Sequence, residues 1–566
     1  MPEYDAFEGH VAGEEVVPVG QASRLASGTL QSRGAGKDAG RQARGLHHIR
    51  LVLFLAATAF AQEIDPQRLR AHVKFLSSDL LEGRAPGTRG GDLAAEYIAS
   101  QLAVAGAKPG AENSSWFQPV PLTGVQANRA TLSADSVALD WLTDFVGQVQ
   151  TQQASQSFDG EAVFVGYGIR APEFGWDDYR GTDVKGKVVV LFTNEPASEN
   201  PKFFGGRALT YYGRWTYKYE EALRQGAAAC LVLHTDATAG YGWDVVHNSW
   251  GREQAQVGNG SSGLAFAGWV SERGAAKLLN VSGRRLGELL KVAGQRQFRP
   301  LSLGVRVRGE IDSRIRTIST RNVIGRISGS DPRLEQEAVL FTAHWDHLGK
   351  SESGEGDLIF NGAVDNATGC ALLLEIARHW SHLPVQPRRP VMFLFTAAEE
   401  AGLRGSQYYV TKPLVPLAKT AVALNFDSFF PFGPTRDVVL DGAERTWLWT
   451  AVQGVAERLS LKISPDPRPE NGAYFRSDHF PFAKAGVPAF SIKAGNQFLT
   501  QGGNAADRIK EYQTRLYHQP GDEYSDDWDF SGMEQIARFG LHLGLEAANS
   551  ERPSLPPKPT VRPSVH

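Results

Sequence analysis

The sequence predicts an α/β fold in which a mixed, mostly parallel sheet is sandwiched between helices. From Arg321 onward, short apolar runs alternate with helical segments. Each run is almost continuously apolar, as expected of strands that are buried on both faces of a sheet. The 566-residue chain is 42% hydrophobic and 21% charged, so it is long enough and apolar enough to bury a large core.

Four apolar runs are the expected strands of this sheet. They cover residues 338–343, 390–397, 420–426 and 487–492. Between the first two runs, residues 368–380 are expected to form a helix whose apolar face includes Leu372, Leu373 and Ile376. Strands that alternate with helices in this way favour a parallel or mixed sheet.

Two amphipathic helices are expected before the sheet, within residues 64–106. Apolar residues recur there at helical spacing in two stripes: Leu69, Val73, Leu76 and Leu80, then Ala94, Tyr97, Ile98 and Leu102. The glycine-rich segment 83–91 lies between the stripes. It lacks the preceding strand and the Gly-Lys-Ser/Thr ending of a phosphate-binding loop, so a helix–helix turn is the preferred interpretation.

Both ends of the chain are predicted to lie outside the fold. Residues 1–45 lack apolar periodicity, and the proline-rich tail 550–566 is also expected to be disordered. The stretch 47–50, the apolar run 51–60 and the small residues up to Ala61 predict a secretory signal peptide, cleaved after Ala61, and export to the periplasm or the medium. A short buried helix is the alternative, and a translation start near Leu46 would suit the signal better.

Charge and cysteine content exclude several kinds of partner. With 59 basic and 62 acidic residues the net charge is −3, so no global positive field is available for nucleic acid. No apolar run reaches the ~20 residues of a membrane-spanning helix. Two cysteines, Cys230 and Cys370, cannot form a disulfide scaffold or a thiolate zinc cluster. A bound metal would therefore need His, Asp and Glu ligands.

Chemically active side chains follow the predicted strands or precede predicted helices. They are His344 and Asp346, Asp365, Glu399 and Glu400, Asp427, and Tyr517 and His518. The carboxyl ends of strands form the ligand crevice of an open α/β sheet, so these side chains are expected to converge there. Two histidines and three carboxylates suit a pair of zinc ions. Because Glu399 and Glu400 point to different sides of the chain, one can bind metal while the other faces a water.

These residues also have ordinary structural interpretations. Asp365 could cap a helix, Glu399 and Glu400 could begin one, and His344 could be a strand-end histidine. Carboxylates at the end of a buried strand are costly without a cation, however, which favours the metal site. Two further histidines are interpreted as non-ligands: His347 and His479.

Five motifs contain the candidate residues in chain order. They are His344-x-Asp346, Gly362-Ala363-x-Asp365-Asn366, Ala398-Glu399-Glu400-x-Gly402, Asn425-x-Asp427 and Tyr517-His518-x-Pro520-x-Asp522. Together they resemble the co-catalytic zinc aminopeptidases, the family of bacterial secreted leucyl aminopeptidases and aminopeptidase Y. The resemblance implies the zinc exopeptidase fold, which is phosphorylase/hydrolase-like.

The same resemblance implies two zinc ions per chain and a place for each ligand. His344 and Asp427 would bind one ion. Glu400 and His518 would bind the other. Asp365 would bridge both.

Three further residues receive catalytic roles from the resemblance. Glu399 would be the general base and acid, and Tyr517 would hydrogen-bond the oxyanion. Asp346 would accept the imidazole N–H of His344 and so fix its tautomer. The implied reaction is the hydrolysis of N-terminal residues from peptides or small proteins with a free N-terminus.

Other functions remain open on the same scaffold. One is a carboxypeptidase, for whose cationic clamp Arg404 and Arg476 are candidates; others are a dipeptidase and a glutaminyl cyclase. A non-catalytic, peptidase-like binding protein would be expected to lack a ligand or the base, and none is missing.

A segment with a different pattern interrupts the catalytic domain. It has strand-like runs at 162–167, 187–192 and 230–234 and a helical piece at 219–225. Its motifs Gly166-Tyr167-Gly168, Asp178-Tyr179 and Gly186-Lys187-Val188 resemble the protease-associated domain, a β-rich insert of several exopeptidases. The predicted limits are 1–61 for the extension and signal, 62–127 and 301–549 for the catalytic domain, 128–300 for the insert and 550–566 for the tail.

Overall fold

The computed structural model describes residues 64–258, 263–351, 354–499 and 505–551. The predicted signal peptide, and all but the first two residues of the predicted tail, lie outside these ranges. The described residues all belong to one unit of the chain, which begins at Ala61. Within these ranges, every helix is too short or too polar to cross a membrane.

A mixed, mostly parallel sheet lies at the centre of the fold, as the sequence predicts. Strand β13 (Ala338–His344) pairs in parallel with β16 (Val391–Thr396) on one side and with β17 (Thr420–Phe426) on the other. Strand β20 (Ala489–Ala494) continues the parallel order beyond β17. These four strands correspond to the four apolar runs of the sequence.

Antiparallel pairs border this parallel group on both sides. Strand β16 pairs antiparallel with β12 (Leu301–Ile327). At the other edge, β20 pairs antiparallel with β18 (Asp437–Val439), which pairs in parallel with β19 (Lys462–Ser464). Large sheets commonly combine parallel and antiparallel pairs in this way.

Helices cover both faces of the sheet because successive side chains of a strand point to opposite faces. Val339 and Phe341 belong to the main hydrophobic core, to which two helices contribute: α9 (Thr368–Ser381) and α14 (Ser531–Asn549). Leu340 belongs to a core on the opposite side, to which two other helices contribute: α10 (Arg404–Thr411) and α12 (His479–Lys484). The strands are therefore buried on both faces, as their continuous apolar runs predict.

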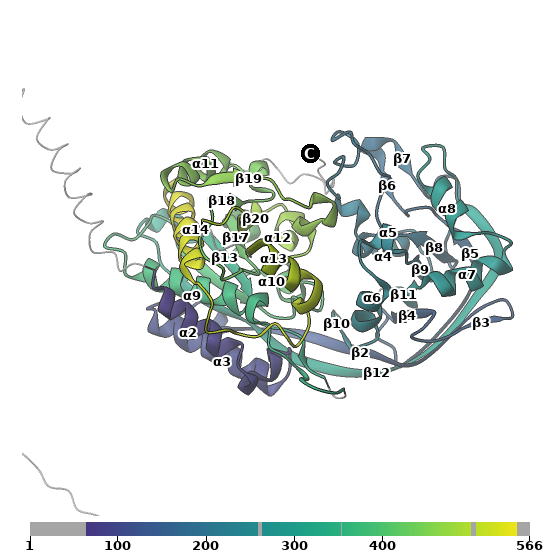
Figure 1. Cartoon of the computed structure of the whole chain (residues 1–566), viewed down its shortest axis with the longest axis horizontal. Coiled ribbons are helices and arrows are strands. Elements are labelled where there is room, and N and C mark those ends of the chain that lie inside the picture. The colour runs from purple at the N-terminus through teal and green to yellow at the C-terminus, as the bar shows by residue number, and fades with distance from the viewer. Residues whose placement is uncertain (1–63, 259–262, 352–353, 500–504, 552–566) are drawn as a thin grey trace, which may run out of the picture. The chain divides into compact units, whose positions relative to one another are not determined.

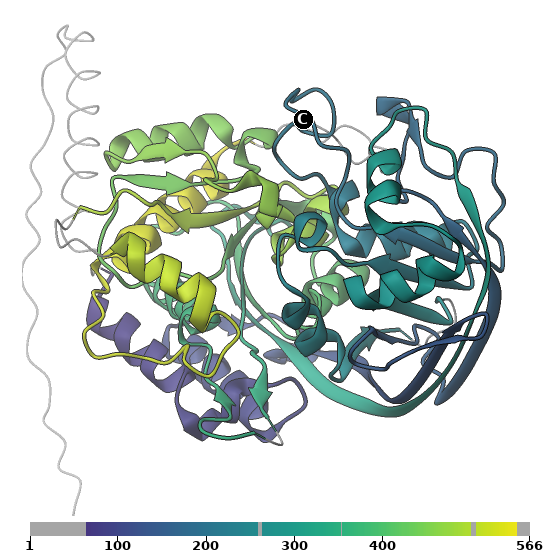
Figure 2. The same cartoon turned by 45° about the vertical axis from the view of Figure 1, so that its right-hand side comes forward.

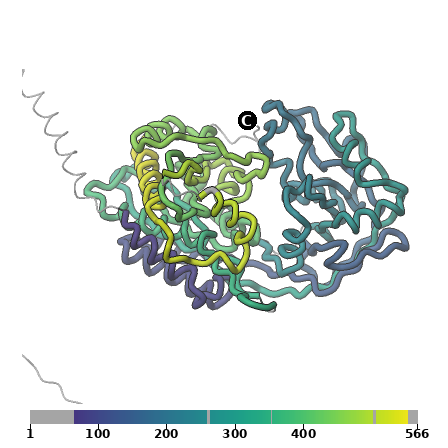
Figure 3. The backbone as a smooth tube through the Cα atoms, viewed as in Figure 1, coloured from purple at the N-terminus to yellow at the C-terminus, as the bar shows by residue number. Residues whose placement is uncertain are grey.

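The two N-terminal helices form as predicted and add to the main core. They are α2 (Pro66–Leu76) and α3 (Arg89–Val104). Asp65 caps α2, because its Oδ1 accepts a hydrogen bond from the N–H of Gln67 at 2.9 Å. In space α2 contacts α14, which comes from the other end of the chain (Figure 3). The expected burial of Leu80 is wrong: α2 ends at Leu76, and Leu80 is 76% exposed in the following 3₁₀ turn.

Residues from the middle of the chain build two further hydrophobic clusters on the same sheet. The strands are β5 (Ser155–Phe164), β8 (Val188–Phe192), β9 (Ala229–Leu233) and β11 (Phe266–Val270), which pair in parallel, and β4 (Phe145–Gln148). The helices packed against them include α4 (Trp215–Arg224) and α7 (Glu272–Val281). This segment thus combines strands with helices.

Two long antiparallel strands connect the two groups of strands. They are β2 (Phe117–Ala134) and β12, which pair along most of their length (Figure 1; Figure 2). Strand β12 also pairs with β16 of the first group and with β5 of the second. The domain limits at 128 and 300, and the likeness of this segment to the protease-associated domain, stay predictions.

The glycine-rich turn between α2 and α3 surrounds the buried side chain of Arg84. Its guanidinium donates to the carbonyl oxygens of Trp345 at 2.8 Å, Leu76 at 2.5 Å and Gly362 at 2.9 Å, and also to that of Asn361. These carbonyls belong to the end of α2, to the residue after β13 and to the segment before α9, so one side chain holds the turn against the chain that precedes α9.

We expect Arg84→Ala to lower the free energy of unfolding by about 3–5 kcal/mol, because four buried carbonyls lose their donor. Chemical denaturation of both proteins measures this difference. Arg89→Ala is the matched control, since Arg89 is exposed at the start of α3 and should change stability little. Equal stability of the Arg84 and Arg89 variants would contradict the structural role of Arg84.

Candidate metal centre

The predicted ligands lie at the ends of parallel strands and at a helix start. His344 is the last residue of β13, Glu399 and Glu400 follow β16, and Asp427 directly follows β17. Asp365 lies in the short turn Ala363–Ala367 that leads into α9. The carboxyl ends of these strands thus bring together residues that are far apart in the sequence, as expected for an α/β crevice.

Asp365 lies between two groups of predicted ligands. Its Oδ1 is 3.1 Å from Nε2 of His344, and its Oδ2 is 3.4 Å from Nε2 of His518. In the first group, His344 Nε2 is 3.3 Å from Asp427 Oδ1. In the second, His518 Nε2 is 3.0 Å from Glu400 Oε2. Each oxygen of one carboxylate therefore faces a different histidine.

His347, interpreted from the sequence as a non-ligand, lies within reach of the second group. Its Nδ1 is 2.8 Å from Glu400 Oε1, and ligand atoms of His347, Asp365 and Glu400 lie within 4.8 Å of one another. The sequence did contain an indication that His347 could be a ligand, because it is three residues after His344 at the same strand end. His479 lies elsewhere: its ring packs on Tyr474, and burial lowers its pKa to about 3.

Asp346 orients the backbone of Glu399. Its Oδ1 accepts a hydrogen bond from the N–H of Glu399 at 3.0 Å. The ring Nδ1 of His344 is 3.2 Å from the backbone oxygen of Asp346 and 3.9 Å from its carboxylate. The carbonyl is thus nearer to the ring than the carboxylate expected from the sequence. Either acceptor would leave Nε2 of His344 free to bind a metal.

Tyr517 lies beside the second group of ligands. Its ring stacks on that of His518, with 3.9 Å between the ring centroids. Desolvation by the surrounding groups raises the pKa of Tyr517 well above its ordinary value, although Arg476 opposes the shift. The hydroxyl therefore stays protonated at neutral pH and can donate a hydrogen bond.

Negative charge dominates the electrostatics of the cluster. Burial by itself would lower the pKa of His344, but Glu399 and Asp427 raise it well above its ordinary value. Burial likewise opposes the charged form of His518, yet Glu400 and Asp365 raise its pKa to about 10. A field that holds protons on the buried imidazole of His344 and the half-buried imidazole of His518 is one that a divalent cation would also satisfy.

The donor atoms of the cluster fit zinc. Glu400 Oε1 and His518 Nε2 are buried atoms whose polar neighbours are other candidate ligands, at 2.8 Å and 3.0 Å. A metal ion would satisfy all of these nitrogen and oxygen atoms together. Imidazole nitrogen and carboxylate oxygen are the zinc ligands of catalytic sites that contain no cysteine.

Hydrogen bonds from outside the cluster hold the Asp365 turn in place. The carboxylate of Asp522 accepts the N–H groups of Val364 and Asp365 at 2.9 and 3.1 Å. Asn366 Oδ1 accepts the N–H of Ser428 at 3.1 Å, which ties this turn to the segment after Asp427. Asp522 was part of a sequence motif, but the sequence did not suggest this role.

Asp427 is oriented by a serine that sequence reasoning did not identify. Ser477 Oγ donates to Asp427 Oδ2 at 2.5 Å and accepts from Asn425 Nδ2 at 2.6 Å. A lone serine fifty residues from its partner carries no sequence signal for this role.

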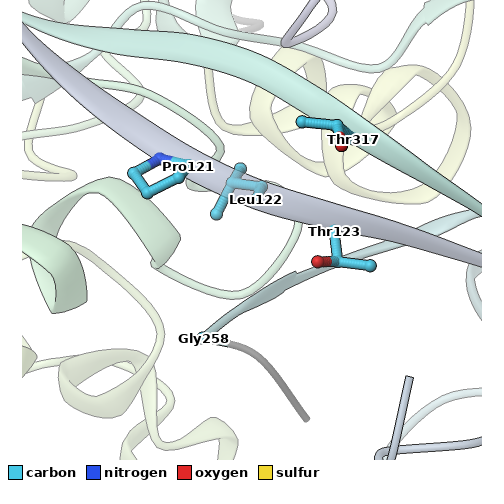
Figure 4. A pocket seen from close by; sticks show the side chains of 5 residues that line it. All are labelled: Pro121, Leu122, Thr123, Gly258 and Thr317. Atoms are coloured by element: carbon cyan, nitrogen blue, oxygen red, sulfur yellow. The ribbon is translucent and has the colours of Figure 1, made fainter. Parts of the chain in front are cut away.

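A separate cavity of about 510 Å³ lies beside β2 and β12. It is lined by Pro121, Leu122, Thr123, Gly258 and Thr317 (Figure 4). None of these side chains is titratable or a usual metal ligand, so the cavity is not the candidate site.

Residues 322–542 match the family model described as Peptidase family M28. This segment contains every predicted ligand and catalytic residue, from His344 to His518. The chain therefore contains a peptidase M28 domain.

Curated relatives match this chain over part of their length. It is 32% identical over 185 residues to "Leupeptin-inactivating enzyme 1" of Streptomyces exfoliatus, covering 32% of this chain and 38% of that protein. It is 31% identical over 199 residues to "Probable leucine aminopeptidase 2" of Aspergillus fumigatus, covering 33% and 36%. "Aminopeptidase YwaD" of Bacillus subtilis is 28% identical over 186 residues, covering 31% and 36%. The match thus spans well under half the length of each of these relatives.

A solved structure supports the fold over most of the chain. The aminopeptidase from Aneurinibacillus sp. strain AM-1 aligns with 89% of this chain and 98% of its own, at a TM-score of 0.51 and 18% identity. At that identity the likeness concerns the fold alone.

Proposed function

We propose that this chain, whose residues 322–542 form a peptidase M28 domain, is an exported aminopeptidase that uses two zinc ions. The observation that carries the proposal is the position of Asp365, with one carboxylate oxygen toward His344 and the other toward His518. The relatives that are named as aminopeptidases support the reaction class.

The two groups of ligands would each hold one zinc ion. His344 and Asp427 would bind the first, Glu400 and His518 the second, and Asp365 would bridge them. When bound, zinc supplies positive charge that polarises a substrate carbonyl and acidifies a water.

Glu399 is the proposed general base. It removes a proton from the attacking water and delivers that proton to the nitrogen of the leaving amine. The hydrogen bond from its backbone N–H to Asp346 holds Glu399 beside the carboxyl end of β16. The Tyr517 hydroxyl donates a hydrogen bond to the oxyanion of the tetrahedral intermediate.

The requirement for a free N-terminus is part of the proposal. A free substrate α-amine would lie beside the second group of ligands, where an acetylated terminus would add bulk. Cleavage is therefore restricted to the first peptide bond of the chain.

The direct test compares free and N-acetylated peptides of one sequence, with and without a chelator. We expect hydrolysis of the free peptide only, complete loss with the chelator, and recovery when zinc is added back. Chelator already saturated with zinc is the control for unspecific effects. Cleavage of the blocked peptide alone would overturn the aminopeptidase assignment, and the absence of chelator-sensitive hydrolysis of either peptide would favour a binding protein.

Export is part of the proposal and rests on the signal-like segment that ends at Ala61. N-terminal sequencing of secreted protein should find Gln62 first. A mature chain that begins earlier would refute this cleavage site.

A further inference from the structure

A buried histidine beside the candidate metal centre has no ordinary partner for its ring. His347 is 1% exposed, and neither of its ring nitrogens has a hydrogen-bond partner within the described ranges. Buried polar atoms normally have partners, and a neutral imidazole can donate from one nitrogen and accept at the other. The absence of both hydrogen bonds therefore needs an explanation.

The lack of hydrogen bonds alone does not indicate a metal ligand, as His479 shows. Its ring is equally buried and also lacks hydrogen-bond partners, but it packs on Tyr474 and forms no ion pair with a carboxylate in the described part of the chain. His347 differs, because its Nδ1 is 2.8 Å from Glu400 Oε1. The proximity of a predicted ligand distinguishes the two histidines.

The contact between His347 and Glu400 is short but lacks the directions of a hydrogen bond. Nδ1 of His347 and Oε1 of Glu400 are both buried atoms without a hydrogen-bond partner, although 2.8 Å separates them. The predicted ligand His518 shows the same combination, because its Nε2 is 3.0 Å from Glu400 Oε2 without a hydrogen bond. Donor atoms that bind one zinc ion at about 2.0–2.2 Å lie roughly 3 Å apart, so both contacts fit a shared ion.

The two oxygens of the Glu400 carboxylate face two different imidazoles. The rings of His347 and His518 meet edge to face, with 5.7 Å between centroids and 74° between planes. Ligand atoms of His347, Asp365 and Glu400 all lie within 4.8 Å of one another, and His518 Nε2 is 3.4 Å from Asp365 Oδ2. Two imidazoles and two carboxylates therefore converge on one region.

The backbone beside His347 leaves room for the ring because it belongs to a glycine. Gly362 has a φ of +58°, and a Cβ at this position would lie 2.5 Å from Cγ and 2.7 Å from Cδ2 of His347. The carbonyl oxygen of Gly362 accepts a hydrogen bond from the buried guanidinium of Arg84 at 2.9 Å. The turn is thus held against the ring, which gives His347 a fixed place beside Glu400.

A role for His347 as a ligand makes the two groups unequal, with three protein donors for the first ion and four for the second. The first group would consist of His344, Asp427 and Asp365, and the second of His347, His518, Glu400 and the shared Asp365. Structural zinc sites are closed by four protein donors, whereas catalytic sites have three and keep one position open. The open position would then belong to the first group.

We propose that His347 is a fourth protein ligand of the second zinc ion, which is therefore held more tightly than the first. This inference rests on the proposed two-zinc function. The competing role for His347 is that of a hydrogen-bond donor that only orients Glu400, and the experiment separates the two roles.

The test uses metal-free protein and two substitutions of His347. His347→Asn keeps an N–H near the place of Nδ1 and can still orient Glu400 by a hydrogen bond, whereas His347→Ala cannot. His382→Asn is the matched control, because His382 is exposed at the end of α9 and is not a candidate ligand. Zinc titration measures the affinity of each site, and X-ray absorption counts the imidazole ligands of protein loaded with one equivalent of zinc.

We expect one of the two zinc sites to weaken ~100-fold or more in both His347 variants, because even residues that only orient a ligand change metal affinity roughly 10–100-fold. With one equivalent of zinc, the wild type should show two imidazole ligands and His347→Asn one. The control should equal the wild type in both measurements.

Wild-type zinc affinity of His347→Asn would overturn the inference, and weak binding by His347→Ala in the same series would show that His347 only orients Glu400. A single imidazole ligand in the wild type at one equivalent of zinc would overturn it as well. Both results leave the proposed function intact. A wild type that binds no zinc tightly would overturn the proposed two-zinc function itself.

Discussion

Glu399→Gln is expected to lower kcat more than ~100-fold and to leave the zinc content of the protein unchanged. The substitution keeps the size of the side chain and removes its ability to accept a proton from water. Among the described residues Glu399 forms no ion pair, whereas Glu400 lies 3.0 Å from His518 and 2.8 Å from His347. The two adjacent glutamates therefore differ in their contacts, although a carboxylate oxygen of Glu399 also lies within 4.8 Å of ligand atoms of His344 and Glu400.

The structure also explains why Glu399 is suited to a proton-transfer role. Burial raises the pKa of Glu399 well above its ordinary value, and the nearby carboxylates Asp427 and Glu400 act in the same direction, against His344. A carboxyl group with a raised pKa is a stronger base when it is ionised, so it can take a proton from an acidified water near neutral pH. A glutamine in the same place retains only hydrogen bonding.

Two measurements on one sample decide the role of Glu399. Metal analysis of the purified variant should equal that of the wild type, while steady-state kinetics show the loss in kcat. Glu457→Gln, a substitution of an exposed glutamate on α11 (Trp449–Arg458), is the control and should behave as the wild type. Turnover of the Glu399 variant within a few-fold of the wild type would remove Glu399 from the mechanism.

The fold was predictable because its central strands are buried on both faces. Such strands read as continuous apolar runs, and the first polar residues after them lie at the crevice. This is why His344, Glu399, Glu400 and Asp427 could be placed before any coordinates were known. The position of His518 depended on its motif, since no strand precedes it.

Side-chain direction was harder to predict than position. The pattern His344-x-Asp346-His347 does not say which side chains enter the crevice once the strand has ended. The structure turns His347 toward Glu400 and turns the Asp346 carboxylate toward the N–H of Glu399. Strand alternation no longer applies in such a loop, so spacing alone cannot assign the ligands.

Contacts between distant segments carried no sequence signal. Tyr211 is separated from Phe475 by more than two hundred residues, and yet its ring packs on those of Phe475 and Phe480. Ser477 reaches Asp427 in the same way, by tertiary packing. Neither residue stands in a periodic pattern that a single sequence could reveal.

Asp365→Ala is expected to weaken zinc binding at both groups of ligands, whereas Asp427→Ala should weaken it at one. The reason is that Asp365 is 3.1 Å from His344 and 3.4 Å from His518, while Asp427 contacts only His344 among the two histidines. Even residues that merely orient a ligand change metal affinity 10–100-fold, so loss of a shared ligand should exceed ~100-fold at each site.

Zinc titration of the metal-free variants distinguishes these outcomes. The wild type should bind two equivalents tightly, Asp427→Ala one tight equivalent, and Asp365→Ala none with wild-type affinity. Asp244→Ala is the control, because Asp244 is exposed in the first turn of α6 (Trp243–Trp250) and is not one of the candidate ligands. Two tight equivalents in Asp365→Ala would show that this carboxylate does not bridge the sites. One tight equivalent would assign Asp365 to a single group of ligands.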